Sequence, residues 1–324
     1  MLKIDKKDME ILYQLDINSR QSLKSIGIKV YLKKNVVQYR IEKLIKNGVI
    51  KNFYTSINFH KLGYINIGVD INFQYYTPKI EKEIIEYFSS SDYSWFISNV
   101  QGYYDLLVLF SVKNMNQFFN FWTKTMMKYR YNFQNASILF FSRTRYFPAS
   151  YLLETYNEID RKNNEIIDGG IQTAIDNTDY NILRQISLNS RKLLTELAKN
   201  LSISSMTVAK RIKKLEKIGI INGYRVNIDY SKLGLQLFNV RFSLKRYENL
   251  KQIIDYAKSN PNLISISEII GEWDISFNYY MRNYNELHKI ICNILEMFPN
   301  DFKNRVTFCY PEIYKSNYMP NLKI

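Results

Sequence analysis

The chain has 324 residues, of which 46% are hydrophobic and 23% charged, and 45 Lys and Arg against 30 Asp and Glu give a net charge of +15. This composition excludes a disordered chain, because 27 Tyr and 19 Phe bring too much apolar surface to stay solvated. It also predicts no membrane span, because polar residues interrupt every apolar run before the roughly 18 residues that a span needs.

The charge surplus, the N-terminal segment and the two cysteines indicate the kind of partner and the cellular compartment of the protein. A surplus of this size favours a polyanionic partner, most often nucleic acid. The segment MLKIDKKDMEIL begins directly in a polar helical pattern, so we expect no signal peptide. Cys292 and Cys309 make neither a disulfide framework nor a paired zinc motif, and we expect a cytoplasmic protein.

The first 63 residues predict three short helices, over 8–15, 23–30 and 35–46. The third helix turns Val36 or Val37, Ile41 and Leu44 inward. Lys33 stands at its cap position, where a lysine is unable to accept a hydrogen bond from the helix amides. Its outward positions are Lys34, Asn35, Gln38, Tyr39, Arg40 and Lys43.

Residues 64–150 predict alternating strands and helices. The segments expected in chain order are Ile65–Phe73, Lys79–Ser89, Tyr93–Val100, Asp105–Val112, Met115–Lys128 and Asn135–Arg145. Read as β-α-β-β-α-β, this order is that of a ferredoxin-like module.

The second half of the chain repeats the first. IDKKDMEILYQLDINSRQSL from Ile4 aligns without a gap with IDNTDYNILRQISLNSRKLL from Ile175, and HKLG at 60–63 with SKLG at 231–234. A polar, Asn-rich linker at 151–174 joins the two units, and the Gly169-Gly170 pair predicts flexibility near its end. The chain is therefore a tandem duplication with an α+β fold.

The second unit begins with helices expected over 179–186, 193–200 and 204–217, in the segment 175–234. Ser204 is a suitable N-cap for the third helix. Asn222-Gly223 predicts a turn between two short β segments, so helix, helix, turn, helix and β-wing make a winged helix-turn-helix. A second ferredoxin-like module, with segments over 236–245, 248–259, 263–270, 274–281, 285–298 and 305–313, fills residues 235–324.

The third helix of each unit is basic outside and apolar inside, so it can lie in a major groove with its N-terminal residues against base edges. Lysine and arginine further along can contact phosphates. The alternative interpretation is a solvated basic face. The candidate DNA-binding residues are Lys34, Asn35, Gln38, Tyr39 and Lys43 in the first unit, and Ser204, Ser205, Thr207, Lys210, Arg211 and Lys213 in the second.

The linked motifs ID..D..IL..L..NSR, RI..L...GII.GY, KLG and G.(Y/W)D resemble the Lrp/AsnC family of leucine-responsive, feast/famine transcription regulators. This resemblance covers almost the whole chain, twice. It implies a sequence-specific regulator of double-stranded DNA that assembles through its ferredoxin-like modules. The resemblance also implies an amino acid or other small effector near the two G-x-x-D tetrads, at Gly102, Asp105, Gly271 and Asp274. The alternative is that each tetrad only makes a tight turn, with Gly supplying a positive φ and Asp bonding to nearby amides.

Two further interpretations stay open. Siroheme decarboxylases resemble the same architecture, but they carry histidine and arginine near the first tetrad, where 99–110 and 268–279 have neither. With His60 and His288 as its only histidines, the sequence offers no metal site, cofactor loop or nucleophile–base pair, so we expect no enzyme, metal or cofactor. The other alternative is an assembly protein that does not bind DNA. We also expect the two ferredoxin-like sheets to pack face to face, either within one chain, which would act as a covalent pseudo-dimer, or between the chains of a homo-oligomer.

Overall fold

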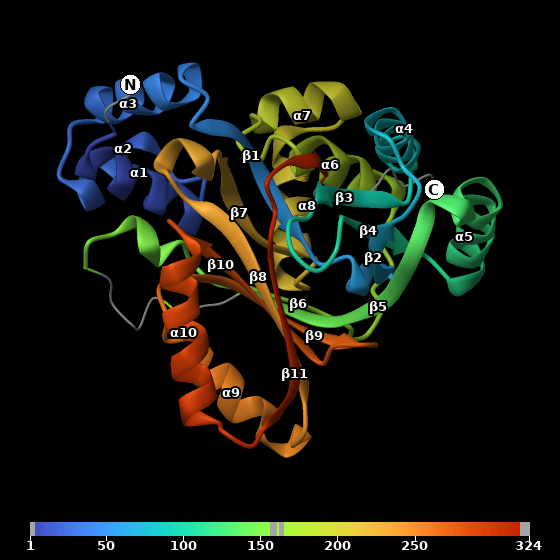
Figure 1. Ribbon diagram of the computed structural model, residues 1–324. Coiled ribbons are helices and arrows are strands. Elements are labelled where there is room, and N and C mark those ends of the chain that lie inside the picture. The colour runs from blue at the N-terminus through green and yellow to red at the C-terminus, as the bar shows by residue number, and fades with distance from the viewer. Residues whose placement is uncertain (1–3, 156–160, 162–164, 318–324) are drawn as a thin grey trace.

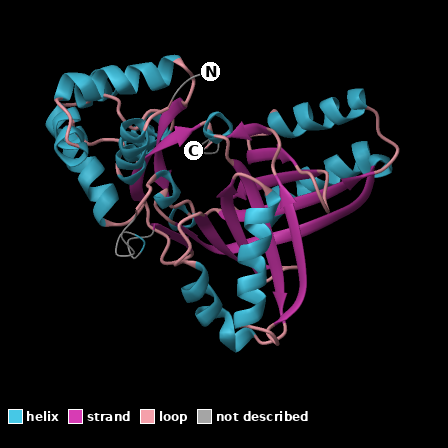
Figure 2. Cartoon of the chain, turned by 60° about the vertical axis from the view of Figure 1, so that its left-hand side comes forward, coloured by secondary structure: helices cyan, strands magenta, loops and turns pink. Residues whose placement is uncertain are grey.

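The computed structural model describes residues 4–155, 161 and 165–317. It shows the predicted α+β architecture: two helical modules at the top of Figure 1, and strands below them with helices on their outer sides. Figure 2 shows the strands gathered in the middle of the molecule and the helices around them.

The two helix-turn-helix modules begin with matching sets of helices. These are α1 (Lys6–Ile17), α2 (Leu23–Val30) and α3 (Lys34–Lys46) in the first unit, and α6 (Asn177–Ser187), α7 (Leu194–Leu201) and α8 (Ser205–Lys217) in the second. The expected apolar stripes are buried, with Val37, Ile41 and Leu44 on α3 and Val208, Ile212 and Leu215 on α8.

The hairpin wing expected at Asn222-Gly223 is wrong. Strand β7 (Ile221–Ile228) runs straight through that pair and bonds antiparallel to β1 (Ile50–Ile57) of the other unit. The reason is tertiary, because a longer ladder with a partner strand satisfies more backbone groups than a local turn. The wing is therefore a ribbon that the two units share.

The chain that leaves each helical module packs on the other one. Ile57 and Phe59, which follow α3, lie in the core formed with α6, α7 and α8, while Val226 and Ile228 lie in the core formed with α1, α2 and α3. The two modules therefore exchange strands, and neither core is complete without residues from the other unit.

The ferredoxin-like modules match the expected order of strands and helices. The first contains β2 (Ile65–Phe73), α4 (Pro78–Ser89), β3 (Ser94–Asn99), β4 (Leu106–Val112), α5 (Met115–Tyr129) and β5 (Phe133–Tyr146). The second contains β8 (Gln236–Leu244), α9 (Leu250–Ala257), β9 (Leu263–Ile270), β10 (Ile275–Met281), α10 (Tyr284–Met297) and β11 (Phe302–Cys309). Short 3₁₀ helices connect the elements at His60–Leu62, Arg130–Asn132, Ser150–Leu152, Tyr230–Leu233 and Tyr247–Asn249.

A strand at or just after the end of each module crosses to the other module. Strand β5 bonds first to β2 and then to β9, while β12 (Ile313–Ser316), which follows β11, bonds to β3. Strand β6 (Glu165–Asp168), inside the segment expected to be only a linker, adds to β5. The resulting path is β11-β8-β10-β9-β5-β2-β4-β3-β12.

The helix-free faces of the two sheets contact each other within the chain. Their shared core draws on both units and contains Val100, Tyr104, Leu107, Leu139, Ile269, Trp273, Val306, Phe308 and Tyr310. The opposite faces are covered by α4 and α5 in one module and by α9 and α10 in the other. Each sheet is thus buried on both sides.

A pseudo-twofold axis runs through the molecule, because residues at equivalent positions of the repeat contact one another. Such pairs are Ser19 with Ser190, Tyr54 with Arg225, Asp70 with Arg241, and Tyr104 with Trp273. Trp273 Nε1 donates to Tyr104 Oη at 2.8 Å, and the two serine hydroxyls are 2.7 Å apart.

The pair on this axis with the greatest consequence is Asp70 and Arg241. The two side chains are 0% and 1% exposed and form a hydrogen-bonded ion pair, with the guanidinium 4.9 Å from the Phe308 ring centroid. Burial raises the pKa of the Asp70 carboxyl, and Arg241 opposes that shift. In a dimer of two identical units, two aspartates or two arginines would face each other at this buried position. Each unit is therefore complementary to the other unit and not to a second copy of itself.

We expect Asp70→Leu to lower the free energy of unfolding by about 3–5 kcal/mol, because it leaves the Arg241 charge buried and unpaired. The double variant Asp70→Leu/Arg241→Met should recover most of that loss, because it removes both charges from the interior. Urea unfolding followed by circular dichroism measures both variants. A double variant as unstable as the single one would contradict a stabilising role for charge pairing.

Candidate nucleic-acid interface

Helix α8 has the cap that the sequence predicts. Ser204 Oγ accepts a hydrogen bond from the backbone N–H of Thr207 at 3.0 Å and lies 2.8 Å from the Thr207 hydroxyl. The Ser204 backbone is extended, with φ −72° and ψ 150°. The first turn of the helix is thus fixed by its own side chains, at the end that would approach base edges.

The candidate residues of α8 divide into two groups. Ser204, Lys210 and Lys213 are exposed, whereas Ser205, Thr207 and Arg211 are partly buried. Arg211 Nη1 lies 2.6 Å from Asp176 and 2.8 Å from Asp179, the cap and first turn of α6. Arg211 therefore holds α8 against α6, and its contact with DNA stays a prediction.

Helix α3 presents its candidate residues to solvent, although its cap is absent. Lys33 is the N-cap residue, with φ −67° and ψ 149°, and its side chain makes no capping hydrogen bond among the described residues, as the sequence predicts. All five candidates are exposed: Lys34, Asn35, Gln38, Tyr39 and Lys43. Gln38 Nε2 donates to Glu42 at 2.9 Å.

Arg40 repeats the arrangement of Arg211. Its Nη1 lies 2.8 Å from Asp5 and 2.7 Å from Asp8. The side chain is only partly exposed, so this residue holds α3 against α1. Both units therefore seat the third helix with the same arginine–aspartate contact.

The repeated KLG motif fastens each third helix to the opposite unit. Lys61 Nζ donates to the Ile218 carbonyl at 2.9 Å, just after α8, and Lys232 Nζ donates to the Asn47 carbonyl at 2.5 Å, just after α3. A cation at a helix C-terminus satisfies free carbonyls and complements the helix dipole. The motif was visible in the sequence, but its partners were not, because they belong to the other repeat.

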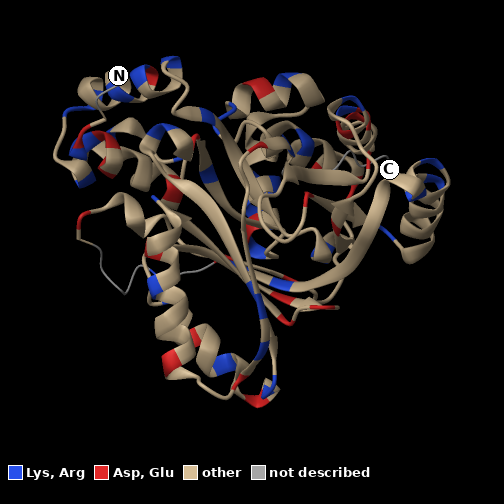
Figure 3. Cartoon of the chain, viewed as in Figure 1, with Lys and Arg blue, Asp and Glu red and all other residues tan. Residues whose placement is uncertain are grey.

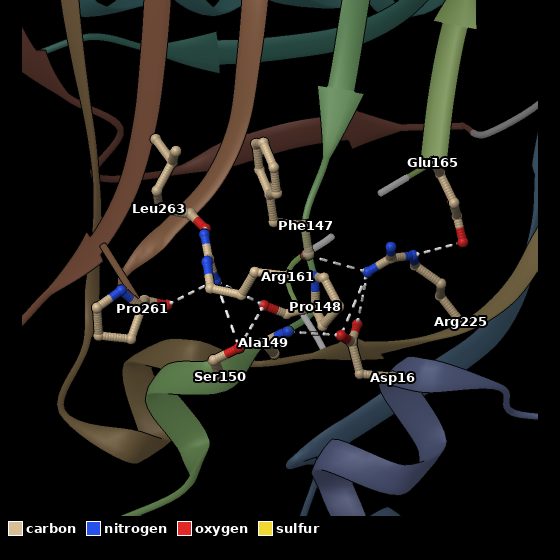
Figure 4. A network of polar contacts seen from close by, with 10 residues as sticks. All are labelled: Asp16, Phe147, Pro148, Ala149, Ser150, Arg161, Glu165, Arg225, Pro261 and Leu263. Atoms are coloured by element: carbon tan, nitrogen blue, oxygen red, sulfur yellow. Dashed lines mark hydrogen bonds and ion pairs between the residues drawn. The ribbon is translucent and has the colours of Figure 1, made fainter. Parts of the chain in front are cut away.

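A buried network around Arg225 joins the first helix, the shared ribbon and the linker (Figure 4). Arg225 Nη1 lies 3.2 Å from Asp16 Oδ2 at the end of α1, and Nε lies 3.0 Å from Glu165 Oε1 on β6. Asp16 also accepts from the Ala149 N–H at 2.8 Å. Burial raises the pKa of Asp16, with Arg225 opposing.

Arg161 continues this network from the linker into the second ferredoxin-like module. Its guanidinium donates to the backbone carbonyls of Pro148, Pro261 and Leu263, as Figure 4 shows. Sequence reasoning missed both arginines. The sequence held one signal for Arg225. The alignment of the two repeats pairs Arg225 with Tyr54 and Asp16 with Ser187, and such unlike residues at equivalent positions indicate contacts that only one unit makes.

The four effector candidates lie in the seam between the two sheets. Asp105 accepts from the Phe73 N–H at 2.7 Å and Asp274 from the Leu244 N–H at 2.6 Å. Gly102 and Gly271 have φ values of 143° and 147°. A Cβ on Gly102 would lie 3.0 Å from Phe308 of the other unit, so this turn requires glycine. An effector contact there stays a prediction.

The remaining sites named from the sequence have local partners. His60 Nε2 lies 3.3 Å from Asn66 Nδ2, and His288 Nδ1 lies 3.6 Å from the Cys292 sulfur. Among the described residues, no cluster of His, Cys, Asp or Glu is placed to hold a metal ion. In the same part of the chain, no helix combines the length and apolar character that crossing a membrane requires.

Lys and Arg positions are spread along the ribbon of both helical modules, including the third helices (Figure 3). Two similar helices, α3 with exposed amides and lysines and α8 with the exposed Ser204 cap and lysines, are features of a class of protein with a pair of nucleic-acid-binding helices. Comparison with known proteins makes the class more specific.

The family model described as winged helix-turn-helix DNA-binding matches residues 4–51 and 175–222. The HTH-type transcriptional regulator LrpA of Pyrococcus horikoshii is 34% identical over 119 residues, which are 37% of this chain and 84% of the relative. The proline dehydrogenase transcriptional activator of Rhodobacter capsulatus is 31% identical over 129 residues, which are 39% of this chain and 84% of the relative. The chain belongs to the Lrp/AsnC family, with two units in tandem.

Among solved structures, the siroheme decarboxylase NirDL has the same fold over the whole length. The TM-score is 0.64 with 98% of this chain and 94% of that chain covered, but only 11% of residues are identical. The two-unit arrangement is therefore not peculiar to this chain, and the likeness extends to fold alone.

The unlike caps of α3 and α8 give a matched test. Lys33 and Ser204 share the same backbone geometry, so Lys33→Ser should create the missing cap and raise stability by about 1 kcal/mol, while Ser204→Ala should lower it by a similar amount. Thermal unfolding with amide hydrogen exchange of α3 and α8 measures both. A Lys33→Ser variant without slower exchange in α3 would contradict the assignment.

Proposed function

We propose that the chain is a transcriptional regulator that binds double-stranded DNA sequence-specifically through α3 and α8. The observation that carries this proposal is the pair of exposed third helices on two equivalent modules, each seated by the same arginine–aspartate contact. Membership of the Lrp/AsnC family and the net charge of +15 support it.

The two readers address different bases. Asn35 and Gln38 on α3 offer amides suited to adenine, whereas α8 offers the Ser204 and Ser205 hydroxyls followed by Lys210. One chain therefore acts as a pseudo-dimer whose two half-sites differ, about one helical turn or a multiple of it apart. The strand exchange supports this reading, because it couples the two modules into one body.

Chains associate further through their ferredoxin-like modules. Phe119 and Met127 on α5 are 66% and 82% exposed, which is unusual for side chains of this size and supports a contact between chains. Such association would repeat the asymmetric site along the DNA.

The proposed function is that of a regulator and not of a decarboxylase. The likeness to siroheme decarboxylase is one of fold at 11% identity, whereas the regulators are related at 31–34%. Loss of siroheme carboxylates in an assay with the purified chain, followed by absorption and mass spectrometry, would contradict this assignment.

Changing Lys210 and Lys213 to Ala should weaken DNA binding and reduce the dependence of log K on log salt by up to about two counterions, because each lysine neutralises one phosphate. Fluorescence anisotropy at several salt concentrations measures both effects. The double variant Lys251→Ala/Lys289→Ala removes the same charge from exposed positions on α9 and α10 and is the control. Equal losses in the two double variants would indicate non-specific attraction.

Footprinting should show two unlike half-sites, each lost separately. Asn35→Ala with Gln38→Ala should remove protection of one half, and Ser205→Ala with Lys210→Ala should remove the other, because different helices read them. Selection of bound sequences gives the motif independently. A palindromic motif, or loss of the same half in both variants, would refute the pseudo-dimer.

A further inference from the structure

A cavity of about 660 Å³ lies between the helix-free sheet faces and the shared β1–β7 ribbon. Strands β5, β8, β9 and β10 form its floor, the ribbon forms its roof, and Trp95, Phe96, Phe141 and Tyr310 contribute aromatic surface. Its volume is that of a small-molecule site, commonly about 300–1,000 Å³. None of the site residues predicted from the sequence lines it.

The floor carries a row of uncharged polar side chains where the sheet would otherwise be apolar. Asn239 Nδ2 donates to Ser276 Oγ and to Asn278 Oδ1, both at 2.7 Å, and Asn278 Nδ2 donates to Ser265 Oγ at 2.9 Å. Ser267 and Thr144 continue the row with hydroxyls 3.0 Å apart. All six residues line the cavity.

Asn239 is left with an unsatisfied group. The side chain is 1% exposed, and its Oδ1 has no hydrogen-bond partner among the described residues. Turning the amide over does not help, because Nδ2 would then lack an acceptor. Trp95 Nε1, a buried donor, is also without a partner among the described residues. An unpaired buried polar atom costs about 1–3 kcal/mol, which a bound ligand would offset.

The charges around the cavity restrict the kind of ligand. Each cationic side chain that lines it is already paired: Lys51 with Asp229 at 3.6 Å, Arg225 with Asp16 and Glu165, and Arg241 with Asp70. Arg241 Nε and Glu165 Oε2 lack hydrogen-bond partners among the described residues, but both side chains belong to these ion pairs. A buried carboxylate or phosphate depends on charge-assisted hydrogen bonds, and here it would meet only cations that a carboxylate already neutralises. The cavity is therefore suited to an uncharged ligand.

We propose that this cavity binds an uncharged, hydroxyl-bearing ring compound of the nucleoside or sugar class. A hydroxyl both donates and accepts, so it satisfies Asn239 in either orientation of the amide. The aromatic residues supply surface for the ring, as they do in pockets lined by apolar groups with a few placed polar ones.

Such a ligand would touch the ribbon that leads directly from both third helices. Strand β1 follows α3 and β7 follows α8, so a ligand that contacts floor and roof together biases how the readers are placed. This consequence rests on the proposed DNA-binding function, whereas the binding site itself does not. Coupling then requires that the affinity of the cavity for its ligand differ between the DNA-bound and DNA-free arrangements of the protein.

Calorimetric titration of the full chain with adenosine, uridine, ribose, glucose and leucine tests the site. We expect at least one uncharged compound to bind with Kd below about 1 mM and to raise the thermal unfolding midpoint. Binding of nucleosides but not ribose or glucose assigns the nucleoside class, and the reverse assigns sugars. Binding of leucine alone, or no binding up to about 10 mM, would overturn the proposal.

Two variants locate the binding. Asn239→Leu and Ser276→Ala should each raise the Kd of the ligand at least about 10-fold, because each removes a polar partner from the floor of the cavity. Asn304→Leu, an exposed position on the neighbouring strand β11, is the matched control and should leave binding unchanged. Unchanged binding in both cavity variants would also overturn the proposal. DNA titrations without ligand, run in parallel, show separately whether the readers work.

Discussion

The pairing of Asp70 with Arg241 is the constraint on which the arrangement of the two units depends. The two residues occupy the same position of the repeat and lie on the pseudo-twofold axis in the protein interior. Two identical units would bring like charges together there, at a cost that the low dielectric of the interior makes severe. The duplication has therefore become a complementary pair, and covalent linkage guarantees that the correct partner is present.

Three exchanges follow from that axis. The β1–β7 ribbon replaces a hairpin in each helical module, β5 and β12 cross between the sheets, and Lys61 and Lys232 each reach the end of the opposite third helix. Each exchange places part of one unit in the core or at a helix terminus of the other. The two third helices are thus held in a defined relation, and the coupling that we propose runs through the ribbon that connects them.

The cavity gives this coupling a physical position. The cavity lies between the polar part of the sheet around Asn239 and the β1–β7 ribbon. A bound ligand would therefore contact the sheets and the strands of both helical modules. In the G-x-x-D turns, by contrast, Asp105 and Asp274 accept hydrogen bonds from backbone N–H groups at the ends of β2 and β8, and the glycines let the two sheets approach. Unlike pairs on the axis and unpaired polar atoms in the cavity are both departures from a simple symmetric core.

The sequence alone determined the two units, the helix positions, the ferredoxin-like order and the Ser204 and Lys33 contrast, because these follow from local periodicity, capping and the repeat itself. It also pointed to the family through KLG and the tetrads. Only the tertiary structure decided that Asn222-Gly223 lies inside a strand, that 165–168 is a strand, and that Arg211 is held by Asp176 and Asp179. Those outcomes depend on partners far away in the chain, and local pattern carries no information on which distant strand or carboxylate satisfies a given group.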